Sequence, residues 1–436
     1  MEKALIIGLG KSGKAAALLL QSEGCMCFGF DDGPGEGPFE DMCVLTKEKA
    51  AQELGKGFFS LVIISPGVSS CHPLYEMARA QGIRCLGEAA LGLQRLNQTC
   101  IGITGTNGKT TVTALVTHVL EANGIPARSL GNIGHPLCEY ALHANEKEIL
   151  VIELSSYQLE TIEGAVLDQA ALLNITPDHL DRHASMEEYA AAKWRIQGAL
   201  KKDGELIVHQ SVLRDWGFLK QVPNSISYDE AMEREGEAVR SVFASFEEKG
   251  HDLENVLVSF LLVRHFGVTP VGFATALRTF KKPAHRVEFV ARIDGVSYFD
   301  DSKGTNIDAT KKAVESMKGP VYLIAGGVDK GASYAYWEET FKGKVRVIFA
   351  LGAARDKIAR EAGAFCRVIK VETLEKAVRE ASLVAEEGSQ ILLSPGCSSF
   401  DMFSSYAHRG EVFQSCVRML EKRPLTTPKE RRQNSS

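Results

Sequence analysis

The segment Gly102-Ile-Thr-Gly-Thr-Asn-Gly-Lys109-Thr110 carries the clearest chemical signal in the sequence. An apolar strand precedes it, and an amphipathic helix is predicted to follow over residues 110–123. Glycines let backbone N–H groups wrap around a phosphate, and the start of a helix adds positive potential. Lys109 can then reach the β- and γ-phosphates of a nucleotide, while Thr110 can bind Mg²⁺. The pattern is not a strict P-loop, because Ile103 occupies the position of the first glycine.

Two further polar residues follow apolar strands in the same part of the chain. Glu153 ends the strand EILVIEL, and His179 follows QAALLNIT in the loop TPDHLD. If these strands are parallel neighbours of the strand before the phosphate loop, both residues reach the edge of the sheet where ligands bind. A carboxylate and an imidazole there can hold a second Mg²⁺.

A second glycine-rich turn lies near the N-terminus. The residues Gly8-Leu-Gly10-Lys-Ser-Gly13 match G-x-G-x-x-G after a strand, and Asp31 follows at the spacing of a ribose-binding acid. This pattern fits a nicotinamide-dependent dehydrogenase, and a phosphate-binding turn for another nucleotide fits equally well. Lys193, on a helix predicted over 186–200, is by itself typical of a solvated helix lysine.

The order of the elements predicts the fold class. Apolar strands alternate with amphipathic helical stretches throughout, which is the α/β pattern. A chain of 436 residues fits three domains at about 150 residues each. We expect a Rossmann-like domain over 1–94, a central P-loop ATPase-like domain with a mostly parallel sheet over 95–283, and a Rossmann-like domain over 284–436.

Composition excludes several classes of protein. The formal net charge of −5 gives no basic footprint for nucleic acid. No apolar run reaches the roughly 18 residues of a membrane span, and the N-terminus does not have the features of a signal peptide. The ten cysteines form no C-x-x-C pair and no zinc spacing, so reduced thiols are expected. These features predict a cytoplasmic protein.

Several motifs in order resemble the Mur ligase family of peptidoglycan synthesis. The resemblance covers nearly the whole chain and includes ITGTNGKTT, GNIGHP at 131–136, IELSSYQLE at 152–160, NITPDHLDRH at 174–183, AAKWRI at 192–197, AHRVE at 284–288, DDSKGTN at 300–306 and SPGCSSFDMF at 394–403. It implies a UDP-binding domain, a central ATPase domain and a C-terminal Rossmann-like domain. Within the family, ELSSYQLE, DDSKGTN and SPGCSSFD resemble members that add D-glutamate to UDP-N-acetylmuramoyl-L-alanine through an acyl-phosphate.

The resemblance also implies roles for individual residues in ATP and metal binding. ATP would be bound by Gly105, Thr106, Asn107, Gly108, Lys109, Thr110, Thr111, Asn255, Arg286 and Asp301. Two Mg²⁺ ions would be held by Thr110, Glu153, His179 and Lys193, the last as a carbamate. Catalysis would rest on Lys109, Glu153, His179 and Lys193.

The two other substrates have implied sites as well. The UDP-linked substrate would contact Gly10, Lys11, Ser12, Asp31, Asp32, Asn132 and His179. D-glutamate would contact Lys303, Thr305, Lys330, Ser399 and Tyr406. Two positions depart from the family pattern: Asp252 replaces an asparagine of an adenine-binding motif, and Tyr406 stands where a phenylalanine is expected. The expected partners are these small molecules alone, with no nucleic acid and no membrane span, and the chain is expected to be a monomer.

Other functions remain open at this point. Another Mur-type ligase or a folylpolyglutamate synthase would keep the chemistry and change the substrates. A nicotinamide-dependent dehydrogenase would leave the phosphate loop without a role. A nucleotide-regulated binding protein would keep the loop but would need no amino-acid pocket.

Overall fold

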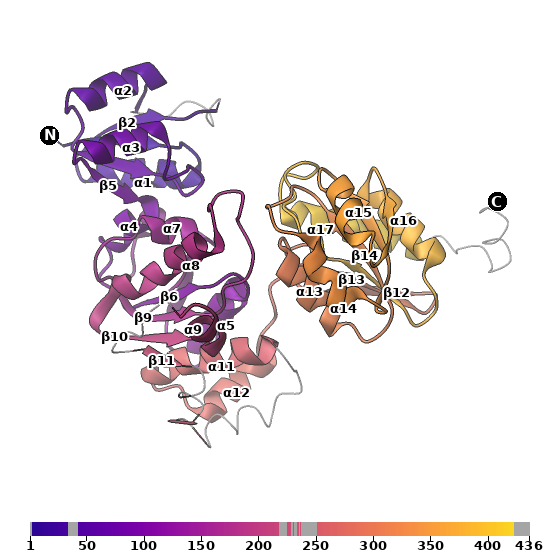
Figure 1. The fold of residues 1–436 in the computed structure, drawn as a ribbon. Coiled ribbons are helices and arrows are strands. Elements are labelled where there is room, and N and C mark those ends of the chain that lie inside the picture. Colours follow the sequence, from indigo (N-terminus) through magenta and orange to yellow (C-terminus); the bar gives the residue numbers. More distant parts are fainter. Residues whose placement is uncertain are drawn as a thin grey trace. The chain divides into compact units, whose positions relative to one another are not determined.

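The computed structural model describes residues 2–33, 42–217 and 251–422, together with a few positions between 225 and 236. The chain forms two compact units (Figure 1). Unit 1 comprises Met1–Ile175 and Glu187–Lys282, and unit 2 comprises Thr176–Met186 and Pro283–Ser436. Each unit is built on parallel strands covered by helices, so the α/β prediction is confirmed. The three domain limits stay a prediction.

The first sheet of unit 1 is wholly parallel, in the order β3-β2-β1-β4-β5. Its strands are β1 (Lys3–Ile7), β2 (Met26–Phe30), β3 (Cys43–Val44), β4 (Leu61–Ile64) and β5 (Arg84–Gly87). Its helices are α1 (Lys11–Ser22), α2 (Lys47–Gly55), α3 (Pro73–Ala80) and α4 (Glu88–Leu93). Ala4 and Ile6 pack in the cluster that contains α1 residues, whereas Leu5 and Ile7 pack in the cluster that contains α2 and α3 residues. Burial on both faces explains why β1 reads as a continuous apolar run.

The second sheet of unit 1 has the order β11-β10-β9-β6-β8-β7. Its strands are β6 (Cys100–Thr104), β7 (Ala127–Gly131), β8 (Ile149–Glu153), β9 (Leu167–Leu172), β10 (Leu200–Val208) and β11 (Ser225–Ser227). Helical segments here are α5 (Lys109–Ala122), α6 (Leu137–Ala141), α7 (Ser156–Glu160), α8 (Met186–Trp194), η1 (Arg195–Ala199), α9 (Gln210–Asp215), α11 (His251–Val263), η2 (Arg264–Phe266) and α12 (Pro270–Thr279). β6 lies between β8 and β9 and is parallel to both, as the site prediction required.

One predicted helix is shorter than expected. The helix predicted over 186–200 ends at Trp194, a 3-10 turn follows over Arg195–Ala199, and Leu200 already belongs to β10. Gly198 lies in that turn, and glycine is a weak helix former. The chain therefore leaves the α-helix early and enters the sheet.

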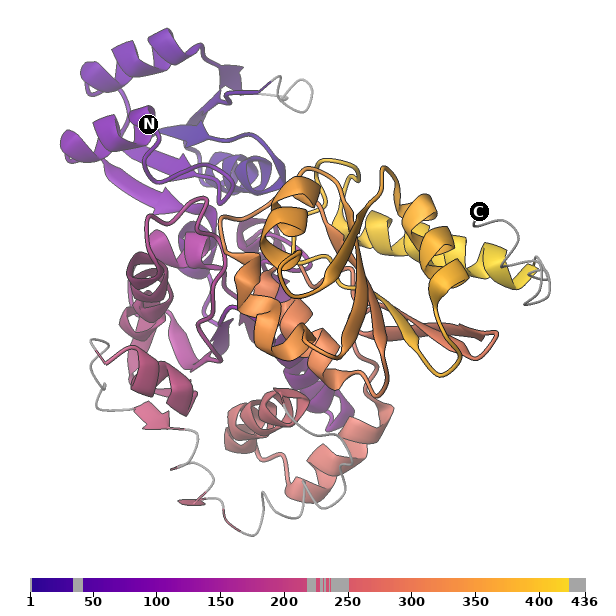
Figure 2. The same ribbon diagram turned by 45° about the vertical axis from the view of Figure 1, so that its right-hand side comes forward.

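The sheet of unit 2 has the order β12-β13-β17-β14-β15-β16, and only the β12–β13 pair is antiparallel. Its strands are β12 (Glu288–Ile293), β13 (Val296–Asp300), β14 (Val321–Gly326), β15 (Val345–Leu351), β16 (Arg367–Lys370) and β17 (Gln390–Leu393). Its helices are α13 (Ile307–Ser316), η3 (Tyr334–Trp337), α14 (Glu338–Phe341), α15 (Arg355–Ala362), α16 (Leu374–Val384) and α17 (Tyr406–Lys422). Helices lie on both faces of this sheet (Figure 2). Leu323 packs with residues of α13, α14 and α15, whereas Tyr322 packs with residues of α16 and α17.

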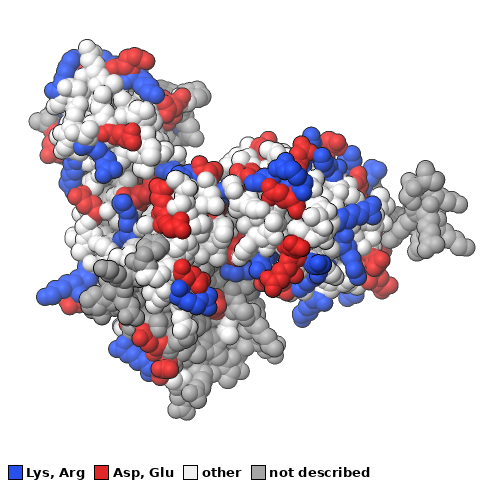
Figure 3. Space-filling view, in the orientation of Figure 1, with Lys and Arg blue, Asp and Glu red and all other residues white. Residues whose placement is uncertain are grey.

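The surface and the helices add two observations. On the face in view, Lys and Arg are interspersed with Asp and Glu over both units (Figure 3).

Among the described residues, none of the helices combines the length and the apolar character that crossing a membrane requires.

A glycine contact joins α4 to α6 in unit 1. A Cβ atom on Gly92 would lie 2.6 Å from the carbonyl carbon of Leu137 and 2.8 Å from the backbone nitrogen of Cys138. The side chain of Glu88 accepts a hydrogen bond from the same Cys138 N–H at 2.7 Å. The two helices therefore meet through backbone, which leaves no room for a side chain at position 92.

We predict that Gly92→Ala destabilises unit 1 by about 1–3 kcal/mol, because its methyl group would overlap the α6 backbone. Gly55→Ala is the matched control, since no atom lies within 4 Å of a Cβ at that helical position. It should leave stability unchanged or slightly raised. Urea unfolding followed by circular dichroism measures both, and equal stability of the two variants would contradict the packing argument.

Candidate active site

The predicted phosphate loop joins β6 to α5 in unit 1. Helix α5 begins at Lys109, and Gly108 before it has a φ of 86°, a left-handed value that favours glycine. A Cβ on Gly108 would also lie 2.5 Å from Oδ1 of Asn255. The Nζ atom of Lys109 donates to the carbonyl oxygens of Gly105 and Thr106, both at 2.9 Å. Asn255, predicted to bind ATP, therefore lies beside this loop, whereas the side chain of Asp252 is outside the described residues.

Asn174, which the sequence did not single out, shapes the loop from the end of β9. Its side chain accepts from the backbone N–H of Asn107 at 2.8 Å and donates to the Asn107 carbonyl at 3.1 Å. Its own carbonyl accepts from Thr106 N–H at 2.9 Å. An asparagine offers one donor and one acceptor side by side, so it can pair with both backbone groups of one residue. The only sequence signal was its place in the NITPDHLDRH motif.

Helix α8 brings Lys193 against the same loop. Lys193 is 1% exposed, and its Nζ donates to the Gly105 carbonyl at 2.8 Å. Nζ also lies 4.5 Å from the ring centroid of Tyr189, whose hydroxyl is 3.2 Å from Oγ1 of Thr106. Lys193 is therefore not a solvated helix lysine. Two ammonium groups, those of Lys109 and Lys193, share one carbonyl acceptor.

Glu153 ends β8 next to the loop strand, as predicted, and is 1% exposed. Its Oε1 accepts from Nδ2 of Asn132 at 2.8 Å, and its backbone carbonyl accepts from Asn132 N–H at 2.9 Å. Its Oε2 is buried and has no hydrogen-bond partner within the described part of the chain. A buried carboxylate oxygen without a donor is costly, so this atom is suited to a ligand such as a cation.

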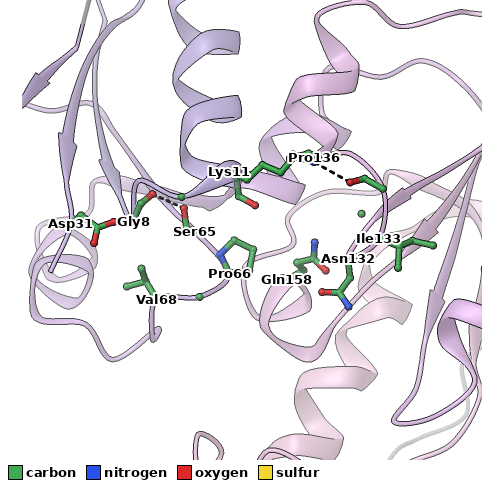
Figure 4. Close-up of a pocket in the computed structure, with 15 residues that line it drawn as sticks. Gly8, Lys11, Asp31, Ser65, Pro66, Val68, Asn132, Ile133, Pro136 and Gln158 are labelled. Carbon is green, nitrogen blue, oxygen red and sulfur yellow. Dashed lines mark hydrogen bonds between the residues drawn. The ribbon is translucent and has the colours of Figure 1, made fainter. Parts of the chain in front are cut away.

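A cavity of about 520 Å³ opens between the first and second sheets of unit 1 (Figure 4). Five residues predicted to contact the UDP-linked substrate line it: Gly10, Lys11, Ser12, Asp31 and Asn132. Ser65–Val68 and Gln158 also line it and were not predicted from the sequence, although Gln158 lies in the IELSSYQLE motif. The backbone N–H groups at the start of α1 suit a phosphate group in this cavity.

Hydrogen bonds hold the rim of this cavity in place. Asp31 accepts from Leu9 N–H at 2.6 Å and from Gly33 N–H at 2.9 Å. Lys11 Nζ donates to the Gly134 carbonyl at 3.2 Å, so it joins the start of α1 to the loop after β7. Asp32 does not line the cavity; its carboxylate lies 3.1 Å from Nε2 of His72.

In unit 2, Arg286 lies between two residues with strained backbones. His285 and Val287 have φ values of 62° and 50°, which are uncommon for residues other than glycine and more so for a β-branched one. Strain of this kind persists only where surrounding contacts impose it. Val287 N–H donates to Asp301 at 3.3 Å, and Nδ1 of His285 is 2.7 Å from Oδ2 of Asp300.

The residues His285, Glu288 and Asp300 are close enough to be considered as a metal site. However, Glu288 accepts from the backbone N–H of His285 at 2.9 Å, and Asp300 also accepts from Gln414 at 2.9 Å. A Cβ on Gly410 of α17 would lie 2.2 Å from Nδ1 of His285, so the helix closes over the group. We interpret the cluster as a hydrogen-bonded support for Arg286.

Asp301 is fully enclosed beside Arg286. It accepts a hydrogen bond of 2.6 Å from Ser394 Oγ. Burial raises the pKa of Asp301 to about 7, with Asp300 adding to the rise, while Ser394 and Arg286 oppose it. A protonated carboxyl group at this position is therefore accessible near neutral pH.

Residues predicted to bind D-glutamate follow three neighbouring strands of unit 2. Lys303 and Thr305 follow β13, Ser399 follows β17 and Lys330 follows β14. β17 is parallel to both β13 and β14, so all three loops lie at the carboxyl edge of one sheet. Tyr406 begins α17; its ring centroid lies 4.0 Å from Lys303 Nζ, and its backbone carbonyl accepts from Ser302 Oγ at 2.8 Å.

Arg409 joins these loops and was missed by sequence analysis. It is 2% exposed and donates to the carbonyls of Ser302 at 2.9 Å and Cys397 at 3.2 Å. Burial lowers its pKa to about 10. An arginine inside a mixed helical sequence is typical of a solvated residue, so no local pattern distinguished it.

Asp178 and His179 lie on the segment Thr176–Met186, which belongs to unit 2, whereas Thr110, Glu153 and Lys193 belong to unit 1. His179 has a φ of 56°, and its Nε2 is 3.6 Å from Oδ2 of Asp178. Although burial opposes it, the pKa of Asp178 falls to about 2, because Lys330, His179 and Asn306 stabilise the carboxylate.

Comparison with known proteins adds sequence relationships to this geometry. Residues 103–256 match the family model of the Mur ligase middle domain, and residues 285–397 match that of the Mur ligase, glutamate ligase domain. A UDP-N-acetylmuramoylalanine--D-glutamate ligase of Protochlamydia amoebophila is 44% identical over 96% of this chain and 98% of its own. A ligase of the same name from Koribacter versatilis is 38% identical over the same shares.

Solved structures share the fold at lower identity. UDP-N-acetylmuramate-alanine ligase MurC from Thermotoga maritima has a TM-score of 0.55 at 16% identity, covering 97% of this chain and 100% of its own. The MurF ligase from Thermotoga maritima in complex with ADP has a TM-score of 0.55 at 17% identity, covering 97% and 96%.

We predict that Asp301 makes stability depend on pH. Its folded pKa of about 7 lies above the ordinary aspartate value of 3.8, so between these values the folded state binds a proton that the unfolded state releases. The stabilisation is complete below the lower value and is lost as pH rises through the upper one, by at most about 1.4 kcal/mol per pH unit.

Asp301→Asn tests this assignment, because an amide can keep both hydrogen-bond partners without titrating. Relative to the variant, the wild type should lose stability from pH 5 to pH 8 in urea unfolding. Parallel stability curves across this range would contradict the raised pKa.

Proposed function

The chain belongs to the Mur ligase family, and we propose that it adds D-glutamate to UDP-N-acetylmuramoyl-L-alanine with hydrolysis of ATP to ADP, in peptidoglycan precursor synthesis. The observation that carries the substrate assignment is the match of nearly the full chain to D-glutamate ligases at 34–44% identity. We reject a dehydrogenase function, because relatives that match nearly the full length of this chain are ligases. In both units, the loops that follow parallel strands carry polar and charged side chains, and we assign them to the three substrates below.

ATP is proposed to bind at the loop of residues 105–111. Backbone N–H groups at the start of α5 would receive the phosphates, and Lys109 would turn from the loop carbonyls to the β- and γ-phosphates. Asn255 would contact the nucleotide from beside Gly108. Arg286 and Asp301 would contact it from unit 2, with Arg286 held by the strained segment around it.

Magnesium fits the residues at this edge of the sheet. Oε2 of Glu153, which has no hydrogen-bond partner among the described residues, is a hard oxygen ligand beside the loop, and Thr110 offers a hydroxyl in the first turn of α5. We propose that these residues hold two Mg²⁺ ions together with His179 and a carbamylated Lys193. When bound, the ions would neutralise charge on the transferred phosphoryl group.

Carbamylation of Lys193 is supported by its surroundings. Its ammonium and that of Lys109 meet at one carbonyl oxygen in a buried site, where like charges repel. Conversion to a carbamate would replace a cation by an anion. That anion would bind a magnesium ion and would attract the Lys109 ammonium group instead of repelling it.

The UDP-linked substrate is proposed to occupy the cavity of unit 1. The α1 N-terminus with Lys11 and Ser12 would bind its diphosphate, and Asp31 would hold the turn that shapes this end. Asn132 would contact the substrate while its side chain orients Glu153. Asp32, outside the cavity lining, and His179, in unit 2, remain proposed contacts from the resemblance.

D-glutamate is proposed to bind at the carboxyl edge of the unit 2 sheet. Lys303 and Lys330 would bind its carboxylates, and Thr305, Ser399 and Tyr406 would fix their orientation, because charge-assisted hydrogen bonds are strong and directional. Arg409 would not touch the substrate. It would hold the loops after β13 and β17 in register.

The reaction proceeds in two steps. The carboxylate of UDP-N-acetylmuramoyl-L-alanine attacks the γ-phosphorus of ATP, which forms an acyl-phosphate and releases ADP. The amine of D-glutamate, after losing a proton, attacks the acyl carbon, and collapse of the tetrahedral intermediate expels phosphate. ATP serves to give a poorly electrophilic carboxylate a leaving group, while Lys109 stabilises the charge on the phosphoryl oxygens.

We also propose a cytoplasmic monomer. The reaction consumes ATP and a UDP-linked precursor, which are cytoplasmic metabolites. Every group assigned above comes from one chain, so a second copy is not required.

The substrate assignment is tested by phosphate release with ATP, UDP-N-acetylmuramoyl-L-alanine and a panel of amino acids. D-glutamate should support turnover, and L-glutamate, L-lysine and meso-diaminopimelate should be poor, because inversion at Cα cannot keep both carboxylates and the amine in register. Lys109→Ala is the inactive control, with an expected loss of roughly 10³-fold. Comparable turnover with any other amino acid would overturn the assignment of D-glutamate.

The carbamate is tested separately. Lys193→Ala should be nearly inactive, and acetate should partly restore activity by supplying a carboxylate. Lys147→Ala, at an exposed position, should retain wild-type activity. Incorporation of labelled carbon dioxide into the wild type gives a direct measurement, and full activity of Lys193→Ala would exclude a functional carbamate.

A further inference from the structure

The segment Thr176–Met186 links β9 of unit 1 to α8 but packs as part of unit 2. Oγ1 of Thr176 donates to Asp308 at 3.1 Å. A Cβ on Gly331 would lie 3.3 Å from the Cβ of Leu180, so the segment also follows the backbone after Lys330 closely. Through these contacts the segment packs against the loops of unit 2 that carry the proposed D-glutamate residues.

Asp178 is the buried charge at the centre of this contact. Its side chain is 6% exposed, and its two oxygens have different donors within unit 2. Lys330 Nζ donates to Oδ1 at 2.9 Å, and Asn306 Nδ2 donates to Oδ2 at 3.0 Å. Asn306 is the N-cap of α13, where its Oδ1 accepts from Ala309 N–H at 2.8 Å. The direction of the Asn306 donor is therefore fixed by the fold.

Lys330 depends on this carboxylate. Its side chain is 12% exposed, and an ammonium group at that depth is costly without a counter-ion. An ammonium has three N–H donors, and the bond to Asp178 uses one of them. The remaining donors of an oriented Lys330 can then bind a ligand carboxylate.

We propose that Asp178 is a positioning residue of the amino-acid site, which orients Lys330 through their ion pair so that it can bind a carboxylate of D-glutamate. The inference rests on the proposed function, in which Lys330 contacts that substrate. Asp178 itself does not contact the amino acid in this proposal. It acts through Lys330, and it ties the segment that bears His179 to the same site.

The test is a double-mutant cycle on the KM for D-glutamate, with phosphate release as the assay. Asp178→Asn should raise this KM about tenfold or more, while the KM for ATP changes by less than about threefold. Lys330→Gln keeps a donor for Asp178 and should also raise the KM. If Asp178 acts through Lys330, adding Asp178→Asn to Lys330→Gln should change the KM by less than about twofold.

Two further variants separate positioning from a structural role. Asp178→Glu retains the charge and should recover part of the D-glutamate affinity that Asp178→Asn loses. Thr176→Val removes another contact of the same segment with unit 2 and should leave the KM for D-glutamate near the wild-type value. If Asp178→Asn proves too unstable to assay, the comparison of Lys330→Gln with the double variant still decides, because that double variant leaves no buried unpaired charge.

The outcomes distinguish this inference from the proposed function. Equal effects of Asp178→Asn in the wild-type and Lys330→Gln backgrounds would overturn the inference, as would a KM unchanged in Asp178→Asn or raised equally in Thr176→Val. A wild-type protein that releases phosphate with another amino acid but not with D-glutamate would instead overturn the proposed function.

Discussion

The parallel pairing of β6 with β8 and β9 is the constraint on which the phosphate site depends. Because parallel strands end at the same edge, the loop after β6, the carboxylate of Glu153 and the side chain of Asn174 are brought to one edge of unit 1. The same rule acts in unit 2, where β17 lies between β13 and β14. Loops far apart in the sequence meet there for the same reason.

Buried hydrogen bonds fix the loops and side chains at these sheet edges in place. Asn174 pairs with both backbone groups of Asn107, and Asn132 orients one oxygen of Glu153 while the other has no partner among the residues that the structure describes. In unit 2, Arg409 donates to backbone carbonyls of the loops after β13 and β17. Polar groups at such depth are stable only when their partners are placed by the fold, so these networks fix geometry as well as charge.

Charged groups in the sites are held in states that fit their proposed tasks. Burial keeps the pKa of Asp301 high, whereas Lys330 and Asn306 keep Asp178 ionised despite its burial. Lys109 and Lys193 converge on one carbonyl, an arrangement that favours an incoming polyphosphate and a change of charge on Lys193. Asp301 and Asp178 are both almost fully buried, so the difference between their pKa values follows from their neighbours.

The sequence alone determined the α/β class, the glycine-rich turn before α5 and the position of Glu153 at a strand end, because strand periodicity, glycine spacing and helix starts are local properties. It also carried the family resemblance, which the relatives confirm. Only the tertiary structure decided that Lys193 is buried against Gly105, that Arg409 joins the loops after β13 and β17, and that Asp178 pairs with Lys330 across 152 positions of sequence. A lysine or arginine on a helix has the same local pattern whether it is solvated or enclosed. Its environment is set by which distant strands lie side by side, and no local spacing records that.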